Sequence, residues 1–278
     1  MKIVSSGRSL YSSEFYKKKK RRKRIWLIII FVGILLFLYS LIYVSRDARL
    51  LIVEVMVREE NTIDKEEIEQ AVRDMLAGHY IWVIPKTNAL IYPRWSIKQS
   101  LLEEFPRLKS VNLDLSGFQT LIISVEERAP FALYCARVFN LTEDSDCYFI
   151  DKDGFIFAQA PSFSGVAYFV YAVQNPIEEP LGKKFITNEE LKQLTGFVEN
   201  LSALNIYPSA LEFRADEYSL YLPSGGQIMW RKNNDLTLIH SNLEAFLSDD
   251  SIRAQSNFLD KILYLDLRTE NKVFYKFR

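Results

Sequence analysis

The chain has 278 residues, 49% of them apolar, with 10 Gly, 9 Pro and 2 Cys, which excludes a disordered chain, a collagen-like repeat and a disulfide-rich scaffold. Its 35 Lys+Arg balance its 35 Asp+Glu over the whole chain, but the charges are unevenly distributed. Residues 1–24 carry ten basic residues and one acidic residue, residues 25–44 carry no charge, and residues 45–278 carry the other 25 basic and 34 acidic residues. This asymmetry excludes an ordinary cytosolic enzyme and indicates a chain divided between two compartments.

Residues 25–44 (IWLIIIFVGILLFLYSLIYV) predict a transmembrane helix. Twenty residues at 1.5 Å each span about 30 Å, the hydrocarbon thickness of a bilayer. A cleaved signal peptide is the alternative, but its apolar region is only about 7–15 residues long and ends in a small-residue cleavage site. Because Val44-Ser45-Arg46-Asp47 is a poor cleavage site, we expect a retained single-pass anchor.

The eight consecutive basic residues Lys17–Arg24 predict the orientation of this anchor. Cationic flanks stay on the cytoplasmic side, so residues 1–24 are expected to form a cytoplasmic basic tail and the C-terminal part to lie outside the plasma membrane. Binding of nucleic acid or anionic lipid is the alternative reading of the basic run. Beside a membrane span we expect no nucleic-acid partner.

Residues 50–128 predict a first extracytoplasmic domain of the order β-α-α-β-β, an α+β unit. The apolar, β-branched run Leu50–Val57 is typical of a strand. The elements expected after it are a helix that begins after the capping residue Asp64 and ends at Gly78, a helix between Pro93 and Pro106, and strands at Lys109–Leu115 and Gln119–Glu126.

Residues 129–278 predict a second domain that is rich in strands. Short strand patterns recur throughout it, and helix patterns begin at Thr187 and Asp235. The turn residues Pro223-Ser224-Gly225-Gly226 predict a hairpin. We expect a mostly antiparallel sheet with helices on one face. The nine predicted strands are Phe131–Val138, Cys147–Ile150, Phe155–Gln159, Ala167–Ala172, Leu211–Arg214, Ser219–Leu222, Gln227–Arg231, Lys261–Arg268 and Lys272–Phe277.

The two cysteines, Cys135 and Cys147, both fall outside the membrane in this topology. They are either two buried free thiols or a disulfide that bridges a hairpin over the polar stretch Phe139–Asp146. A bridge that closes about a dozen residues stabilises a fold by roughly 3 kcal/mol. The spacing is not the CxxC of a redox enzyme, so the pair indicates stability and not catalysis.

The sequence predicts no catalytic, cofactor or metal site. His79 and His240 are far apart and stand in no metal-ligand motif, and nucleotide-binding and hydrolase signatures are absent from the sequence. Asp151-Lys152-Asp153-Gly154 lacks the remaining ligands of a calcium loop and is interpreted as a turn. We expect no enzyme, no cofactor and no small-molecule substrate; a membrane-anchored wall hydrolase with an unrecognised carboxylate pair is the alternative.

The final predicted strand is the candidate binding site. In it Val273, Tyr275 and Phe277 point to one face and Lys272, Phe274 and Lys276 to the other. A terminal strand offers unpaired backbone groups, so it can bind a partner strand by β-augmentation. The alternative is an ordinary last strand whose lysines deter aggregation. Asp266 and Arg268 share one face of the preceding strand and are expected to pair with each other.

In its order of segments the chain resembles the FtsQ/DivIB family of bacterial cell-division proteins, and its first domain resembles a POTRA domain. The resemblance covers residues 17–278, and the order of the matches is more specific than any one of them. The matching segments are IDKEEIEQAV at 63–72, LLEEFPRLKSVNLDL at 101–115, Glu127-Arg128-Ala129-Pro130, Tyr148–Gly154 and Tyr264–Arg268.

This resemblance implies a non-enzymatic, single-pass membrane scaffold of the divisome at the division septum. Such a scaffold recruits FtsB/DivIC and FtsL and helps control septal peptidoglycan synthesis. Carried over by position, the resemblance implicates Lys272–Phe277 as the strand that receives FtsB/DivIC. A POTRA-bearing component of protein export is a further alternative, for which tandem POTRA repeats would be expected.

Overall fold

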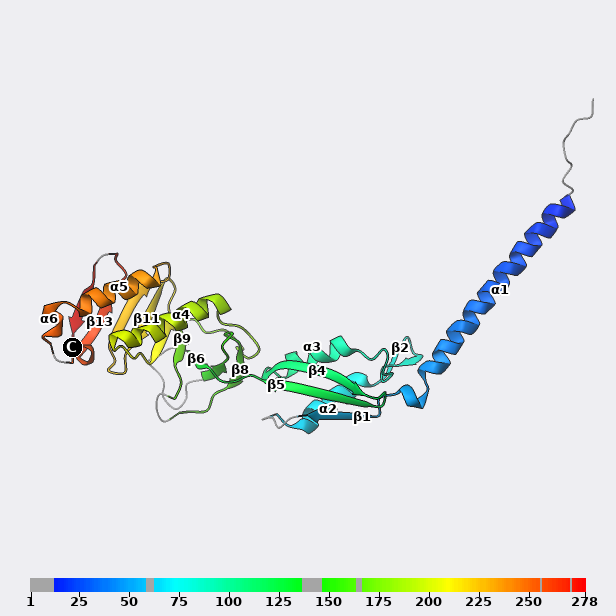
Figure 1. The fold of residues 1–278 in the computed structure, drawn as a ribbon, viewed down its shortest axis with the longest axis horizontal. Coiled ribbons are helices and arrows are strands. Elements are labelled where there is room, and N and C mark those ends of the chain that lie inside the picture. Colours follow the sequence, from blue (N-terminus) through cyan, green and yellow to red (C-terminus); the bar gives the residue numbers. More distant parts are fainter. Residues whose placement is uncertain (1–12, 59–62, 137–146, 164–166, 256, 271) are drawn as a thin grey trace, which may run out of the picture. The chain divides into compact units, whose positions relative to one another are not determined.

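The computed structural model describes residues 13–58, 63–136, 147–163, 167–255, 257–270 and 272–278, and the side chains of the first helix from Lys19 onward. Within these residues the chain is an α+β protein, as expected, with one apolar N-terminal helix and a large β-rich part (Figure 1). It divides into two compact units, residues 1–98 with 112–124 and residues 99–111 with 125–278.

The N-terminal helix α1 runs from Ser13 to Ser45. Its segment Lys19–Ser45, 27 residues, is the one helix of the described part that is long and apolar enough to cross a membrane, and none of its most apolar stretch is buried. In the interior of a helix every backbone N–H and C=O is satisfied within the segment, so exposed apolar side chains such as Leu36 and Phe37 can face lipid. The chain is therefore consistent with a single-pass membrane protein.

A three-stranded sheet of order β1-β5-β4 follows α1 (Figure 1). β1 lies parallel to β5, with Glu54 opposite Thr120 and Arg58 opposite Ser124. The predicted order β-α-α-β-β is observed, with a short hairpin between the helices that the sequence analysis did not predict. The elements are η1 (Ala48–Leu50), β1 (Glu54–Arg58), α2 (Lys65–Leu76), β2 (His79–Tyr80), β3 (Ile84–Pro85), α3 (Arg94–Glu104), β4 (Leu108–Ser116) and β5 (Thr120–Glu127).

The first strand begins later than the predicted Leu50, because the residues before it are used elsewhere. Leu50 ends the short helix η1, and its carbonyl accepts a hydrogen bond from Ala89 N at 2.8 Å. Leu51 forms an isolated bridge to Asn88. The helix α2 begins as predicted: Asp64 accepts a hydrogen bond from Glu66 N, and the stripe Ile68, Val72, Leu76 is buried.

The β-rich part is built on a nine-stranded sheet of order β14-β13-β12-β11-β10-β9-β6-β7-β8. Its strands are β6 (Ala132–Ala136), β7 (Cys147–Ile150), β8 (Ile156–Gln159), β9 (Val170–Val173), β10 (Ala210–Phe213), β11 (Glu217–Tyr221), β12 (Gln227–Arg231), β13 (Ile262–Asp266) and β14 (Phe274–Phe277). Its helices are α4 (Asn188–Asn200), η2 (Leu201–Leu204), α5 (Leu236–Leu247), α6 (Asp250–Arg253) and α7 (Phe258–Lys261).

Most strand pairs of this sheet are antiparallel, as expected, but the sheet also contains parallel pairs. The pairs β6–β9, β9–β10 and β12–β13 are parallel, and the other five are antiparallel. Parallel neighbours need a crossover connection. The helix α4 connects β9 to β10, and α5, α6 and α7 lie between β12 and β13.

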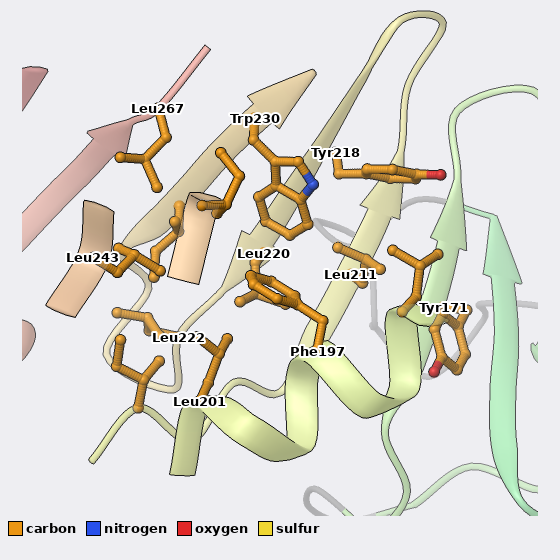
Figure 2. Packing of buried hydrophobic residues seen from close by; sticks show 14 of the residues in the cluster. Tyr171, Phe197, Leu201, Leu211, Tyr218, Leu220, Leu222, Trp230, Leu243 and Leu267 are labelled. Carbon is orange, nitrogen blue, oxygen red and sulfur yellow. The ribbon is translucent and has the colours of Figure 1, made fainter. Parts of the chain in front are cut away.

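These crossover connections also decide which face of the sheet the helices cover. β9 and β12 run in the same direction and both crossovers step the same way along the sheet, so right-handed connections put α4 and α5 on one face. Figure 2 shows Phe197 of α4 beside Leu220 and Trp230 of the sheet, and Leu243 of α5 belongs to the same buried cluster. Trp230 is fully buried, with the Phe197 ring centroid 5.2 Å away.

Candidate functional site: the C-terminal edge strand

β14 lies at one end of the nine-stranded sheet. It pairs antiparallel with β13, with Leu265 opposite Tyr275 and Asp266 opposite Phe274. Within the described residues no strand pairs with its other side. The strand therefore presents backbone donors and acceptors that a further strand can use.

The outward-facing amides of β14 follow from its last bond. Arg278 N donates to Lys261 O at 3.1 Å, which places the Arg278 amide on the β13 side. Backbone groups of a strand alternate between its two sides, so the amides of Phe277 and Tyr275 face away from β13. Those of Phe274 and Lys276 face the neighbouring strand.

The side chains of β14 occupy two faces, as the alternation predicts. The Tyr275 ring lies 5.2 Å from that of Phe246 in α5, and the Phe277 ring lies 5.3 Å from that of Phe258 in α7. Phe274, on the other face, is 52% exposed, and Lys276 is exposed as well. Of the six predicted site residues, Lys272 and Val273 precede the strand; Lys272 is exposed, and Val273 packs against the core.

A groove of about 600 Å³ runs beside β14 on the helix face. Val273 and Tyr275 form one wall, and residues of α5, of α6 and of the connection between them form the other. This groove was not predicted from the sequence, because the period of α5 predicts a helix and not the strand on which the helix packs. The lining residues are Asn242, Ala245, Phe246, Asp249, Ser251, Ile252, Val273 and Tyr275.

The C-terminal end of β14 is held by the predicted β11–β12 turn. The Arg278 guanidinium donates to the Ser224 carbonyl in that turn. Gly225 has φ +86°, and a Cβ there would meet the Arg278 guanidinium. At Gly226 a Cβ would lie 2.9 Å from the Ile262 carbonyl oxygen. Both glycines are needed because the turn closes against β13 and the chain end.

A charge network covers the sheet face opposite the helices. Arg268 makes a bidentate pair with Asp266, with distances of 2.6 and 2.9 Å, and reaches Glu217 of β11 at 2.9 Å. The predicted Asp266–Arg268 pairing is therefore confirmed. Hydrogen bonds from Arg268 lower the pKa of Asp266. Because these bonds bind Arg268 to two acidic residues, the network holds the chain that leads into β14.

The network continues to a buried carboxylate. Glu212 of β10 is 7% exposed, pairs with Arg214 at 2.8 Å and accepts a hydrogen bond from the Tyr221 hydroxyl at 2.8 Å. Burial, together with the neighbouring Glu212 carboxylate, raises the pKa of Tyr221 to about 12. The neutral hydroxyl is thus the form that the folded protein stabilises.

We expect this tyrosine to make the protein less stable in alkali. The pKa of Tyr221 in the folded protein lies above the ordinary value of about 10. Its contribution to the free energy of unfolding is therefore present below pH 10 and is lost as the pH rises toward 12. Two pH units correspond to about 2–3 kcal/mol. The free energy of unfolding, measured by urea titration at pH 9 and pH 12, should fall less in Tyr221→Phe than in the wild type. An equal fall in both would contradict this assignment.

The two cysteines are bonded to each other. Cys135 of β6 and Cys147 of β7 lie directly opposite each other in register, so the bridge joins neighbouring strands of one hairpin. Both are buried in a second apolar cluster with Val170, Ala172 and Ala210. The predicted polar stretch between them, Phe139–Asp146, lies outside the described residues.

The Asp151–Gly154 segment is a turn between β7 and β8, as interpreted from the sequence. Asp151 accepts hydrogen bonds from Asp153 N and Phe155 N through one carboxylate oxygen, and its other oxygen accepts from Arg128 at 2.5 Å. His79 is exposed on β2, and His240 lies in α5 beside a groove with α4. In the described part of the chain no three His, Cys, Asp or Glu side chains are grouped as metal ligands.

No protein-family model matches the chain, and no curated protein gives a significant match. Within the residues that the structure describes, the fold and the site define an α+β protein with one candidate membrane helix and an edge strand, β14, that no other strand covers.

Proposed function

We propose that this chain is a single-pass membrane scaffold of the bacterial divisome, of the FtsQ/DivIB type, in which β14 binds an FtsB/DivIC-type partner. The open outer side of β14 is the observation that carries this proposal. The element order β1-α2-α3-β4-β5 supports a POTRA-like first domain. The exposed basic residues Lys19–Arg24 support a cytoplasmic N-terminus and an extracytoplasmic C-terminal part.

Recognition would follow from the strand geometry. The outward amides of Tyr275 and Phe277 would donate to a partner strand, and main-chain hydrogen bonds of this kind give affinity without dependence on sequence. The exposed Phe274 and Lys276 on one face, and the groove at Val273 and Tyr275 on the other, would select the partner's side chains. A scaffold acts by raising the local concentration of the proteins that it holds. In this role FtsL would join through FtsB/DivIC, and the process controlled would be septal wall synthesis. Such a role needs no catalytic group.

A matched pair of variants tests the main-chain contact. Tyr275→Ala removes the side chain alone, whereas Tyr275→Pro also removes the outward N–H; proline is tolerated on the solvent side of an edge strand. With the full chain in nanodiscs and an FtsB/DivIC-type peptide, we expect Tyr275→Pro to bind at least about tenfold more weakly than Tyr275→Ala, a difference of about 1.4 kcal/mol.

Hydrogen exchange gives a second measure on the wild type. The peptide should protect the amides of Tyr275 and Phe277 and leave those of Phe274 and Lys276, which already face β13, almost unchanged. Equal binding by the two variants, or protection confined to another surface, would refute β-augmentation at β14.

A further inference from the structure

The hairpin β2–β3 has a turn that its residues fit poorly. Val83 N donates to Tyr80 O at 3.1 Å and closes a tight turn. Its two central residues, Ile81 and Trp82, have φ of +46° and +67°. Turns of this kind favour Asn-Gly, because a left-handed backbone strains residues with a bulky side chain and above all β-branched ones.

The side chains at this turn are also almost fully exposed, Ile81 to 86% and Trp82 to 92%. Neither contributes burial that could offset the strain of its backbone. Strain of this kind is retained where a residue serves a function. The fold of the hairpin therefore explains the turn, but it does not explain an isoleucine and a tryptophan at its tip.

The hairpin is joined to the end of the membrane helix. Arg46, the residue after α1, donates from Nε to Val83 O at 3.0 Å. Asn88 donates from its side chain to Ser45 O, the last carbonyl of α1, at 2.8 Å. Figure 1 shows β2 beside this end of the helix. Trp82 is therefore close to the end of α1, because it adjoins Val83 in the chain and consecutive Cα atoms are 3.8 Å apart.

Two more exposed apolar residues follow Asn88, whose side chain bonds to the end of α1. The Asn88 side chain also accepts a hydrogen bond from Leu90 N at 3.0 Å, and Leu90 and Ile91 are 66% and 46% exposed. We call Ile81, Trp82, Leu90 and Ile91 the juxtamembrane patch. The interfacial layer on each side of a bilayer is about 5–8 Å thick. Val83 and Asn88, which neighbour the patch in sequence, are hydrogen-bonded to the end of α1, so the patch is within reach of this layer if α1 crosses the membrane.

We propose that the juxtamembrane patch inserts into the phospholipid interface on the C-terminal side of α1. Tryptophan prefers this layer because its ring is apolar and its N–H is polar, and the neighbouring apolar side chains leave water there. The contact would restrain the first unit against the lipid surface, beyond what a lone helix can do. This inference depends on α1 crossing the membrane and is independent of the proposed binding at β14.

A nitroxide scan of the full chain in nanodiscs of phosphatidylcholine and phosphatidylglycerol tests the insertion. Cys135 and Cys147 are bonded, so Trp82→Cys provides a single reactive thiol. Leu36→Cys in the middle of α1 is the reference for the bilayer, and Glu67→Cys on the exposed face of α2 is the reference for water. The collision rate with oxygen, relative to that with a water-soluble nickel complex, should be several-fold higher at position 82 than at position 67.

The proposal would be overturned if the ratio of oxygen to nickel collision rates were the same at position 82 as at position 67, while the ratio at position 36 showed that this residue lies in the bilayer. A ratio at position 36 as low as that at position 67 would overturn the premise that α1 crosses the membrane. A protein partner on the patch predicts the first of these results, because none is present in the nanodisc.

A second variant separates membrane contact from folding. Ile81→Asn/Trp82→Gly supplies the preferred residues of the turn, so the thermal unfolding midpoint should rise or stay unchanged. A nitroxide at Leu90→Cys should nevertheless become more accessible to the nickel complex in this background. Unchanged accessibility with a retained fold would count against insertion through the tip.

Discussion

Replacing Arg128 by leucine is expected to lower the free energy of unfolding by about 3–5 kcal/mol, the usual effect of removing one partner of a buried ion pair. Its guanidinium pairs with Asp151 at 2.5 Å, with side-chain exposures of 14% and 8%. It also donates to the Pro106 carbonyl at 3.2 Å and lies 3.9 Å from the centroid of the Phe155 ring. The variant therefore leaves Asp151 charged and without its cation.

Urea unfolding in detergent micelles, followed by near-ultraviolet circular dichroism, measures the change. Lys109→Leu is the control, because its pair with Glu126 at 2.7 Å is exposed on both sides and solvent screens it. We expect its effect to be far smaller. Asp151→Asn should recover part of the loss in the Arg128→Leu background, since it removes the unpaired charge. Similar effects of the Arg128 and Lys109 variants would refute the assignment of the buried pair.

Removing the disulfide by Cys135→Ala/Cys147→Ala is expected to destabilise the protein by about 3 kcal/mol. The two cysteines are 12 residues apart in sequence, and closing a loop of that size restricts the unfolded chain. The same urea titration measures the difference, and the wild type in reductant should approach the double variant. A loss below about 1 kcal/mol would indicate that the unfolded state stays compact without the bridge.

The local pattern of apolar, polar and turn residues was sufficient to predict most of the helices and strands. The strands predicted at Lys109–Leu115 and Gln119–Glu126 match β4 and β5 nearly to their ends, and the capping residue Asp64 correctly predicted the start of α2. The misses are short or irregular. The hairpin β2–β3 has only two residues in each strand, and its Ile-Trp turn lacks the glycine or asparagine that would mark it.

The candidate binding site could be predicted in part. Alternation in the last strand placed Tyr275 and Phe277 on one face, and the rings that they meet in α5 and α7 became known only from the structure. Glu217 was not singled out from the sequence, although it binds Arg268, which is 51 residues away. No local signal marks such a pair, because the two residues meet only after β11, β12 and β13 have aligned.

The sequence by itself determined the apolar helix, the α+β composition and the faces of the strands, because each depends on a period of 3.6 or 2 residues or on a run of apolar side chains. The tertiary structure decided which strands are parallel, that Arg128 meets Asp151, and that β14, like β8 at the other end, is an edge strand of the nine-stranded sheet. These features depend on hydrogen bonds and packing between distant segments. Many strand orders satisfy the same local pattern, and only the joint packing of all strands and crossovers selects one.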